Sequence, residues 1–187
     1  GLTDSEQITV ETAGGTLELL RAADGQVTVN MGIPRLEPAD IPFDAPARAS
    51  HYGLDTGSAT IEIAAVSMGN PHAVVRVDDI DAAPVAELGP LIERHPRFPQ
   101  RVNAGFMQII DAGTIRVRVY ERGAGETLAC GSGACAAVVA GRIWGQLNDT
   151  VKVMLNGGEL MVSWADEGAP VMMTGPATTV YQGQIDL

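Results

Sequence analysis

The sequence predicts an α+β fold in which a curled mixed β-sheet is wrapped around one central helix of small residues. Short segments that alternate apolar and polar residues recur along most of the 187 residues, a pattern typical of β-strands. Turns rich in glycine separate many of these segments. Residues 132–144, in contrast, carry Ala and Val on nearly every side, as expected of a helix that other elements surround.

The first part of the chain predicts three strands followed by an irregular crossover. Two glycine-containing turns, Ala13-Gly14-Gly15 and Ala23-Asp24-Gly25, separate the strands. The three strands are residues 7–11, 16–21 and 26–30. Residues 31–46 contain four prolines, so this segment should be extended and irregular.

The middle of the chain predicts two strands, a helix and a hairpin. Asp residues within 78–81 offer an N-cap for a helix over 84–94, which has an apolar face at helical spacing. Asp111-Ala112-Gly113 is typical of a hairpin turn. The expected strands are residues 60–66, 73–77, 106–110 and 115–120.

After the central helix, which Gly145 ends, a second hairpin is expected across Asn156-Gly157-Gly158-Glu159. Its strands are residues 151–155 and 160–164, and the last two strands are 171–174 and 178–182.

Composition excludes several classes of function. The formal charge of −11 argues against a nucleic-acid partner, which requires clustered Lys and Arg. No apolar run is long enough to cross a membrane, and two cysteines provide neither a disulfide framework nor a metal site. We therefore expect a cytoplasmic protein with reduced thiols and no metal. Lys152, the only lysine, lies in a strand pattern, so a pyridoxal-phosphate Schiff base is not expected either, and we predict no cofactor.

One stretch, residues 120–137, suggests chemistry. Cys130 stands just before the central helix, where unpaired N–H groups carry partial positive charge and favour a thiolate. Gly131 and Gly133 allow the backbone to approach a carboxylate. A basic thiolate beside an anion nest suits removal of the α-proton of an amino acid. The alternative is that Cys130 is a small buried residue in a Gly/Ala-rich turn.

The run Glu-Arg-Gly-Ala-Gly-Glu-Thr followed by Ala-Cys-Gly-Ser-Gly-Ala-Cys closely resembles the second cysteine motif of diaminopimelate epimerases. Three further segments are similar to that family in order and spacing: Ser67–His72, Arg101–Met107 and Met173–Ala177. The resemblance covers most of the chain. It implies cofactor-independent conversion of LL-2,6-diaminopimelate to the meso form, with two cysteines on opposite faces of the α-carbon.

The resemblance also implies roles for individual residues. Cys130, His72 and Glu121 would be catalytic, with Glu121 contacting the thiol and the α-amino group. Substrate would be bound by Asn70, Asn103, Glu121, Arg122, Gly131 and Ser132. Judged alone, Asn70 and Asn103 could be turn residues, His72 a core or surface histidine, and Glu121 and Arg122 a solvated charge pair.

Family members have two similar halves with one catalytic cysteine each, and the Cys-Gly-Asn-Gly motif of the first half is absent here. We therefore expect residues 1–30, with 176–187 returning to them, to be the remnant of a first domain, and residues 31–175 to form the C-terminal domain. The expected partners are the small-molecule substrate and the missing N-terminal half. Self-association, such as a homodimer, is also expected. The chain alone should be almost inactive.

Three alternatives remain open. The chain could be a related racemase of another amino acid, although Asn70, Asn103 and Arg122 favour a polar, charged distal group. It could be a module that binds an amino acid without chemistry. It could be a redox protein that uses Cys130 and Cys135, which the lack of a Cys-x-x-Cys motif disfavours.

Overall fold

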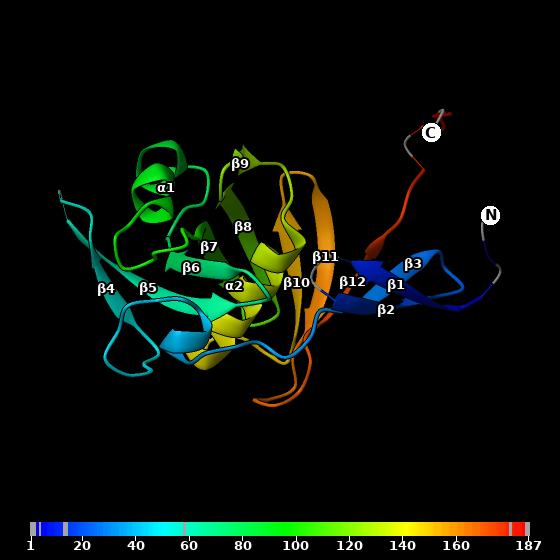
Figure 1. Cartoon of the computed structure of the whole chain (residues 1–187), viewed down its shortest axis with the longest axis horizontal. Helices are drawn as coiled ribbons and strands as arrows, with labels where there is room; N and C mark the ends of the chain where they lie inside the picture. Colours follow the sequence, from blue (N-terminus) through cyan, green and yellow to red (C-terminus); the bar gives the residue numbers. More distant parts are fainter. Residues whose placement is uncertain (1–2, 4, 13–14, 58, 180, 186–187) are drawn as a thin grey trace.

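A mixed sheet of 12 strands runs through the part of the chain that the computed structural model describes, residues 3, 5–12, 15–57, 59–179 and 181–185 (Figure 1). The strand order is β1-β2-β3-β12-β11-β10-β8-β7-β6-β5-β4, and β9 pairs with β8 outside this path. Within these residues there are two α-helices and one short 3-10 helix, at Pro38–Asp40. The predicted mixed sheet with few helices is confirmed.

The first three strands form an antiparallel group, as the alternating pattern predicts. They are β1 (Gln7–Thr12), β2 (Gly15–Arg21) and β3 (Gln26–Asn30). Residues 13 and 14 of the predicted first turn lie outside the described residues. Strand β12 (Met172–Pro176) pairs antiparallel with β3 and so joins this group to the remaining strands.

The remaining strands combine local hairpins with two parallel pairings. Both predicted hairpins are present, β7 with β8 and β10 with β11, because alternating segments flank their turns. Strand β6 pairs in parallel with β7, and β8 in parallel with β10. The bounds are β4 (Tyr52–Asp55), β5 (Thr60–Ser67), β6 (Pro71–Arg76), β7 (Asn103–Asp111), β8 (Thr114–Glu121), β9 (Gly125–Thr127), β10 (Thr150–Leu155) and β11 (Gly158–Ser163).

The register of the central strands brings distant segments to one end of the sheet. His72, the second residue of β6, is the parallel partner of Asn103, the first residue of β7. Ala104 in turn faces Tyr120, next to the last residue of β8. The turn before β6, the start of β7 and the end of β8 therefore lie side by side.

Two hydrophobic clusters lie on opposite faces of the central strands. Helix α2 (Gly131–Ile143) packs against β5, β6, β7, β8, β10 and β11, and its residues 133–141 are all buried. Helix α1 (Val85–Glu93) packs on β7, β8 and β9. Successive side chains of a strand point to opposite faces, so Met107 joins the cluster around α2 whereas Phe106 joins the cluster beside α1.

Some local predictions are wrong. No described residue of 178–182 is in a strand, and the pairing of β12 with β3 ends at Pro176, opposite the first residue of β3. The Asp residues of 78–81 do not cap α1, which begins after Pro84 without a side-chain cap. The carboxylate of Asp81 instead accepts two hydrogen bonds of 2.8 Å from Arg116. Strands β4 and β9 were not predicted.

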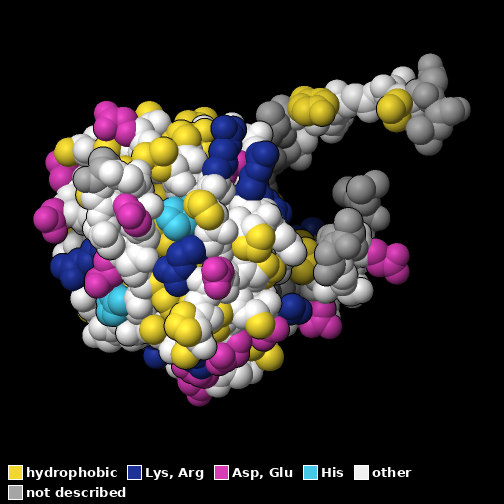
Figure 2. All heavy atoms as spheres, turned by 60° about the vertical axis from the view of Figure 1, so that its left-hand side comes forward, with side chains coloured by type: hydrophobic (Ala, Val, Ile, Leu, Met, Phe, Trp, Pro, Cys, Tyr) yellow, Lys and Arg dark blue, Asp and Glu magenta, His cyan; other side chains and the backbone are white. Residues whose placement is uncertain are grey.

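The surface shows no continuous basic region on the face seen in Figure 2, where acidic and basic side chains are interspersed. The formal net charge is −11. Among the described residues, no helix has both the length and the apolar character that crossing a membrane requires.

Candidate active site

Cys130 is the N-cap residue of α2, and its backbone is extended with φ −139° and ψ 105°. Its side chain is 6% exposed. Sγ donates a hydrogen bond to Oε2 of Glu121 across 3.2 Å, and Oγ of Ser132 lies 3.7 Å from the sulfur. The structure therefore brings together the thiol and carboxylate that the sequence places nine residues apart.

The Cys130 thiol is stabilised in its neutral form. Burial raises its pKa, and the hydrogen bond to Glu121 raises it further. The hydroxyl of Ser132 and the N–H of Gly133 act in the opposite direction but do not reverse the shift. The expected bias toward thiolate at a helix start is therefore wrong for this structure, because burial and a carboxylate neighbour outweigh the helix terminus.

The start of α2 leaves backbone N–H groups beside this thiol. The first hydrogen bond of the helix runs from the N–H of Ala134 to the carbonyl of Cys130, at 2.9 Å. The three preceding N–H groups have no acceptor inside the helix. A Cβ on Gly133 would lie 2.9 Å from Cγ2 of Val119 and 3.2 Å from Sγ of Cys130, so only glycine fits there without displacing a neighbour.

Glu121, at the end of β8, has its carboxylate fixed from two sides. The hydroxyl of Thr127 donates to Oε1, while the thiol of Cys130 donates to Oε2. Strand β9 brings Thr127 into place, because Thr127 pairs with Val119 of β8. Sequence reasoning missed Thr127, which lies in a segment expected to be a loop, and the Gly-Glu-Thr run is too short for a strand pattern.

His72 forms a second group with Asn70 and Ser132. Its Nε2 lies 3.0 Å from Oδ1 of Asn70 and 3.2 Å from Oγ of Ser132, and Nδ2 of Asn70 donates to the same Oγ across 3.4 Å. Since Oδ1 can only accept, the geometry assigns the ring proton to Nε2. Ser132 links the ring to the thiol, because its Oγ lies 3.2 Å from Nε2 and 3.7 Å from Sγ of Cys130.

The His72 ring is neutral. It is 1% exposed, and burial lowers the pKa to about 3, with the charge of Arg122 contributing. Nδ1 is buried and has no hydrogen-bond partner among the described residues. Protonation would place a second, unsatisfied N–H at that atom, and such a buried group is costly.

Asn103 and Arg122 are joined to each other rather than to the thiol. Nδ2 of Asn103 donates to the carbonyl of Pro71 at 3.2 Å, and its Oδ1 accepts the backbone N–H of Arg122 at 2.8 Å. The Arg122 guanidinium donates to the carbonyl of Gln100 at 3.0 Å. The side chain of Arg122 is exposed and that of Asn103 is 3% exposed.

Cys135 lies apart from these groups in the cluster around α2 and is fully buried. Burial raises its pKa to about 12, so its thiol stays neutral at ordinary pH. Cys130 belongs to the same cluster, and its thiol also raises the pKa of Cys135, after burial.

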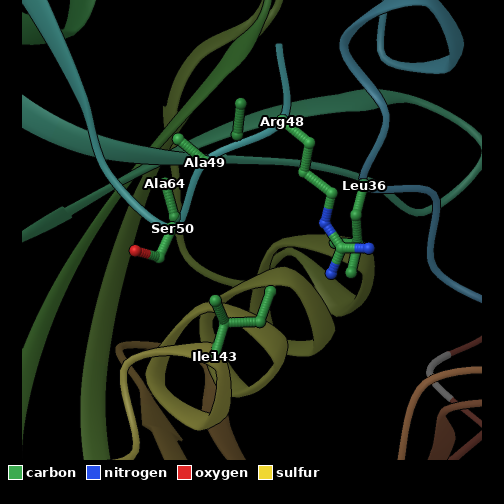
Figure 3. Close-up of a pocket in the computed structure, with 7 residues that line it drawn as sticks. Leu36, Arg48, Ala49, Ser50, Ala64 and Ile143 are labelled. Atoms are coloured by element: carbon green, nitrogen blue, oxygen red, sulfur yellow. The ribbon is translucent and has the colours of Figure 1, made fainter.

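A cavity of about 300 Å³ lies at the opposite end of α2 (Figure 3). Ile143, from the last turn of the helix, lies below the side chains of Arg48 and Leu36. A 13-residue helix is about 20 Å long, so this cavity is far from Cys130. A hollow of about 800 Å³ instead reaches Asn70, between the turn before β6 and the first strands.

A family model and individual relatives match this chain, and both point to the same family. Residues 64–180 match the family model described as diaminopimelate epimerase. The diaminopimelate epimerase of Thioalkalivibrio sulfidiphilus is 62% identical over 188 residues, which cover 100% of this chain and 68% of that protein. The diaminopimelate epimerase of Chromobacterium violaceum is 60% identical and has the same coverage.

Solved structures show the same fold at much lower identity. A hydroxyproline epimerase from Agrobacterium vitis has a TM-score of 0.61 at 18% identity, covering 93% of this chain and 58% of that one. A PhzF-family phenazine biosynthesis protein from Bacillus anthracis has a TM-score of 0.60 at 14% identity, covering 93% of this chain and 66% of that one.

Proposed function

The chain belongs to the diaminopimelate epimerase family, and on that premise we propose that it carries one face of the active site of a cofactor-independent epimerase. The substrate would be LL-2,6-diaminopimelate and the product its meso form, in lysine and cell-wall synthesis in the cytoplasm. The chain spans about two thirds of the length of its relatives. The second catalytic cysteine would come from the part of the family's length that this chain does not include.

The hydrogen bond from Cys130 to Glu121 carries the proposal, because a thiol that donates to a carboxylate still holds the proton that it would deliver to the substrate. An opposing thiolate would remove the α-proton and become a thiol. Cys130 would deliver its own proton to the other face of the α-carbon and become a thiolate. The C–H bond broken on one face is replaced on the other, and in the reverse reaction the two sulfurs exchange roles.

The start of α2 would hold the negative charge that develops on the carboxylate. The N–H groups of Gly131 and Ser132 precede the first intrahelical bond and can donate to the substrate's α-carboxylate. Stabilising that charge in a site closed to water lowers the barrier to a carbanion. Glu121 would receive the α-ammonium group.

Asn70, Asn103 and Arg122 would bind the distal end of the substrate. A guanidinium is suited to a carboxylate because it offers parallel N–H donors. The exposed position of Arg122 leaves it accessible to a ligand. In this proposal Asn103 acts partly by holding the backbone of Arg122, which its Oδ1 accepts at 2.8 Å.

His72 would act toward the opposing cysteine rather than toward Cys130. Its buried Nδ1 has no partner among the described residues, whereas Nε2 is already engaged. A neutral imidazole nitrogen can accept a hydrogen bond from a thiol and so orient it. This proposal gives each cysteine its own neighbouring hydrogen-bond acceptor, Glu121 for Cys130 and His72 for the other.

We assign residues 1–30, with 176–187, to a first domain that the absent segment would complete, and residues 31–175 to the second. In the second domain the sheet would curl around α2, which contacts six strands. The chain alone would be nearly inactive. Exposed strand edges would favour self-association, including a homodimer.

The test is proton NMR of LL-diaminopimelate in D2O with this chain, with and without the separately produced first third of the Thioalkalivibrio sulfidiphilus relative. We expect the α-proton signal to disappear only with both parts present. Cys130→Ser should abolish formation of the meso isomer, whereas the matched variant Cys135→Ser should keep it. Rapid inversion by the chain alone would refute the half-site, and no exchange with both parts would refute this substrate.

A further inference from the structure

Glu93 is a buried carboxylate that the proposed mechanism does not use. It is the last residue of α1 and is 1% exposed, whereas Glu87 on the same helix is exposed. An ionised group is rarely buried unless several donors surround it. The partners of Glu93 therefore show what the residue holds in place.

The partners lie in two separate loops. Oε1 accepts the backbone N–H of Gly123 at 3.0 Å and lies 3.5 Å from Nη1 of Arg101, while Oε2 lies 3.2 Å from Nε of Arg94. Both arginine side chains are more than half exposed, so solvent screens their charges. The N–H of Gly123 is the nearest of the three donors, at 3.0 Å against 3.2 and 3.5 Å. The main-chain carbonyl of Glu93 also accepts the N–H of Val102 at 3.1 Å.

Arg122 is bonded to both of these loops, the one that contains Gly123 and the one that contains Arg101. It directly precedes Gly123, its backbone N–H donates to Asn103, and its guanidinium donates to the carbonyl of Gln100. Arg101, between those two acceptors, has a left-handed backbone with φ 60°. Such a conformation in a non-glycine residue persists only where its surroundings fix it.

Helix α1 makes a second contact with the region around Arg122, one helical turn before Glu93. A Cβ on Gly89 would lie 2.6 Å from the ring of Tyr120, so the helix backbone packs directly on the end of β8. The helix therefore contacts the chain on both sides of Glu121 and Arg122, at Tyr120 by packing and at Gly123 by a hydrogen bond.

We propose that Glu93 is a positioning residue that fixes the two loops around Arg122 and so directs its guanidinium toward the distal carboxylate of the substrate. This inference rests on the proposed function. Glu93 itself does not touch substrate. Its loss would loosen the Arg122–Gly123 turn and weaken binding of the distal carboxylate in the ground state and transition state alike.

The experiment compares Glu93→Ala and Glu93→Gln with Glu87→Ala, which removes an exposed carboxylate from the same helix. The chain combined with the complementing segment is assayed with diaminopimelate. We expect Glu93→Ala to raise KM by about tenfold while kcat falls less than about threefold, the pattern of lost uniform binding. Glu93→Gln should show a smaller rise, because its amide oxygen still accepts from Gly123, and Glu87→Ala should show none.

A second measurement uses the chain alone and does not depend on turnover. Amide hydrogen exchange at Gly123 should accelerate by about tenfold in Glu93→Ala, as expected when a bond of about 1.4 kcal/mol is lost. If wild type shows no turnover, the proposed function fails and this exchange rate still decides the positioning. Unchanged exchange at Gly123, or a lower kcat at unchanged KM, would overturn the inference.

Discussion

The His72 ring should make the folded chain sensitive to acid. Its pKa is about 3 in the folded chain and 6.5 for an ordinary histidine. Between these values the unfolded chain binds a proton that the folded chain does not, so stability is fully present above pH 6.5 and is lost as pH falls toward 3. At pH 5 the loss is 1.36 × log(1 + 10^1.5), or about 2 kcal/mol.

The loss of stability at pH 5 depends on the pKa of His72 in the folded chain only if that pKa approaches 5. The physical cause is the position of Nδ1, which is buried without a partner among the described residues while Nε2 already donates its proton. A charged ring would need a second acceptor, and the nearby charge of Arg122 opposes the added positive charge.

The matched variant is His72→Gln, whose side-chain amide can occupy the position of Nε2 and cannot titrate. Urea unfolding of both chains at pH 8, 7, 6 and 5 gives each free energy of unfolding. The difference isolates His72, since other groups titrate in both. We expect wild type to lose about 2 kcal/mol more than the variant between pH 8 and pH 5. Parallel curves, or an imidazole proton resonance of His72 that titrates near 6.5, would refute the reasoning.

The remaining predictions concern the thiol and two glycines. Glu121→Gln should lower the pKa of Cys130, because the carboxylate raises it, so alkylation by iodoacetamide at pH 8 should accelerate while epimerisation slows. Gly89→Ala should destabilise the chain by about 1–3 kcal/mol in urea, because its Cβ would lie 2.6 Å from Tyr120. Gly105→Ala is the matched control, since its Cβ would meet nothing nearer than 3.9 Å, and unchanged stability is expected there.

The elements that the sequence predicts well are those with local causes. The hairpin of β10 and β11 follows from Asn156-Gly157 between two alternating segments, and α2 follows from a run of small apolar residues that ends before a glycine. Parallel pairing of β6 with β7 has no such local signal, because 26 residues and helix α1 separate their ends. Yet this pairing places His72 beside Asn103.

In the site, too, local features can be predicted from the sequence and tertiary features cannot. The motif around Cys130 identifies the thiol and its neighbours, but the direction of its pKa shift depends on burial and on Glu121, which are tertiary effects. The role proposed for Glu93 could not be predicted from the sequence either. A glutamate beside an arginine at a helix end resembles a solvated pair in the sequence, and only its 1% exposure and the bond from Gly123 distinguish it.

The resting charges constrain how an epimerase built on this chain would work. Cys130 is a thiol and His72 is neutral, so the charges beside the site are those of Glu121 and Arg122. Burial and the carboxylate of Glu121 both keep Cys130 protonated, while the N–H of Gly133 favours a thiolate. A substrate ammonium placed against Glu121 would offset the effect of the carboxylate. Substrate binding would therefore lower the barrier to proton release from Cys130. The contact with Glu121 would thus make the acidity of Cys130 depend on whether substrate occupies the site.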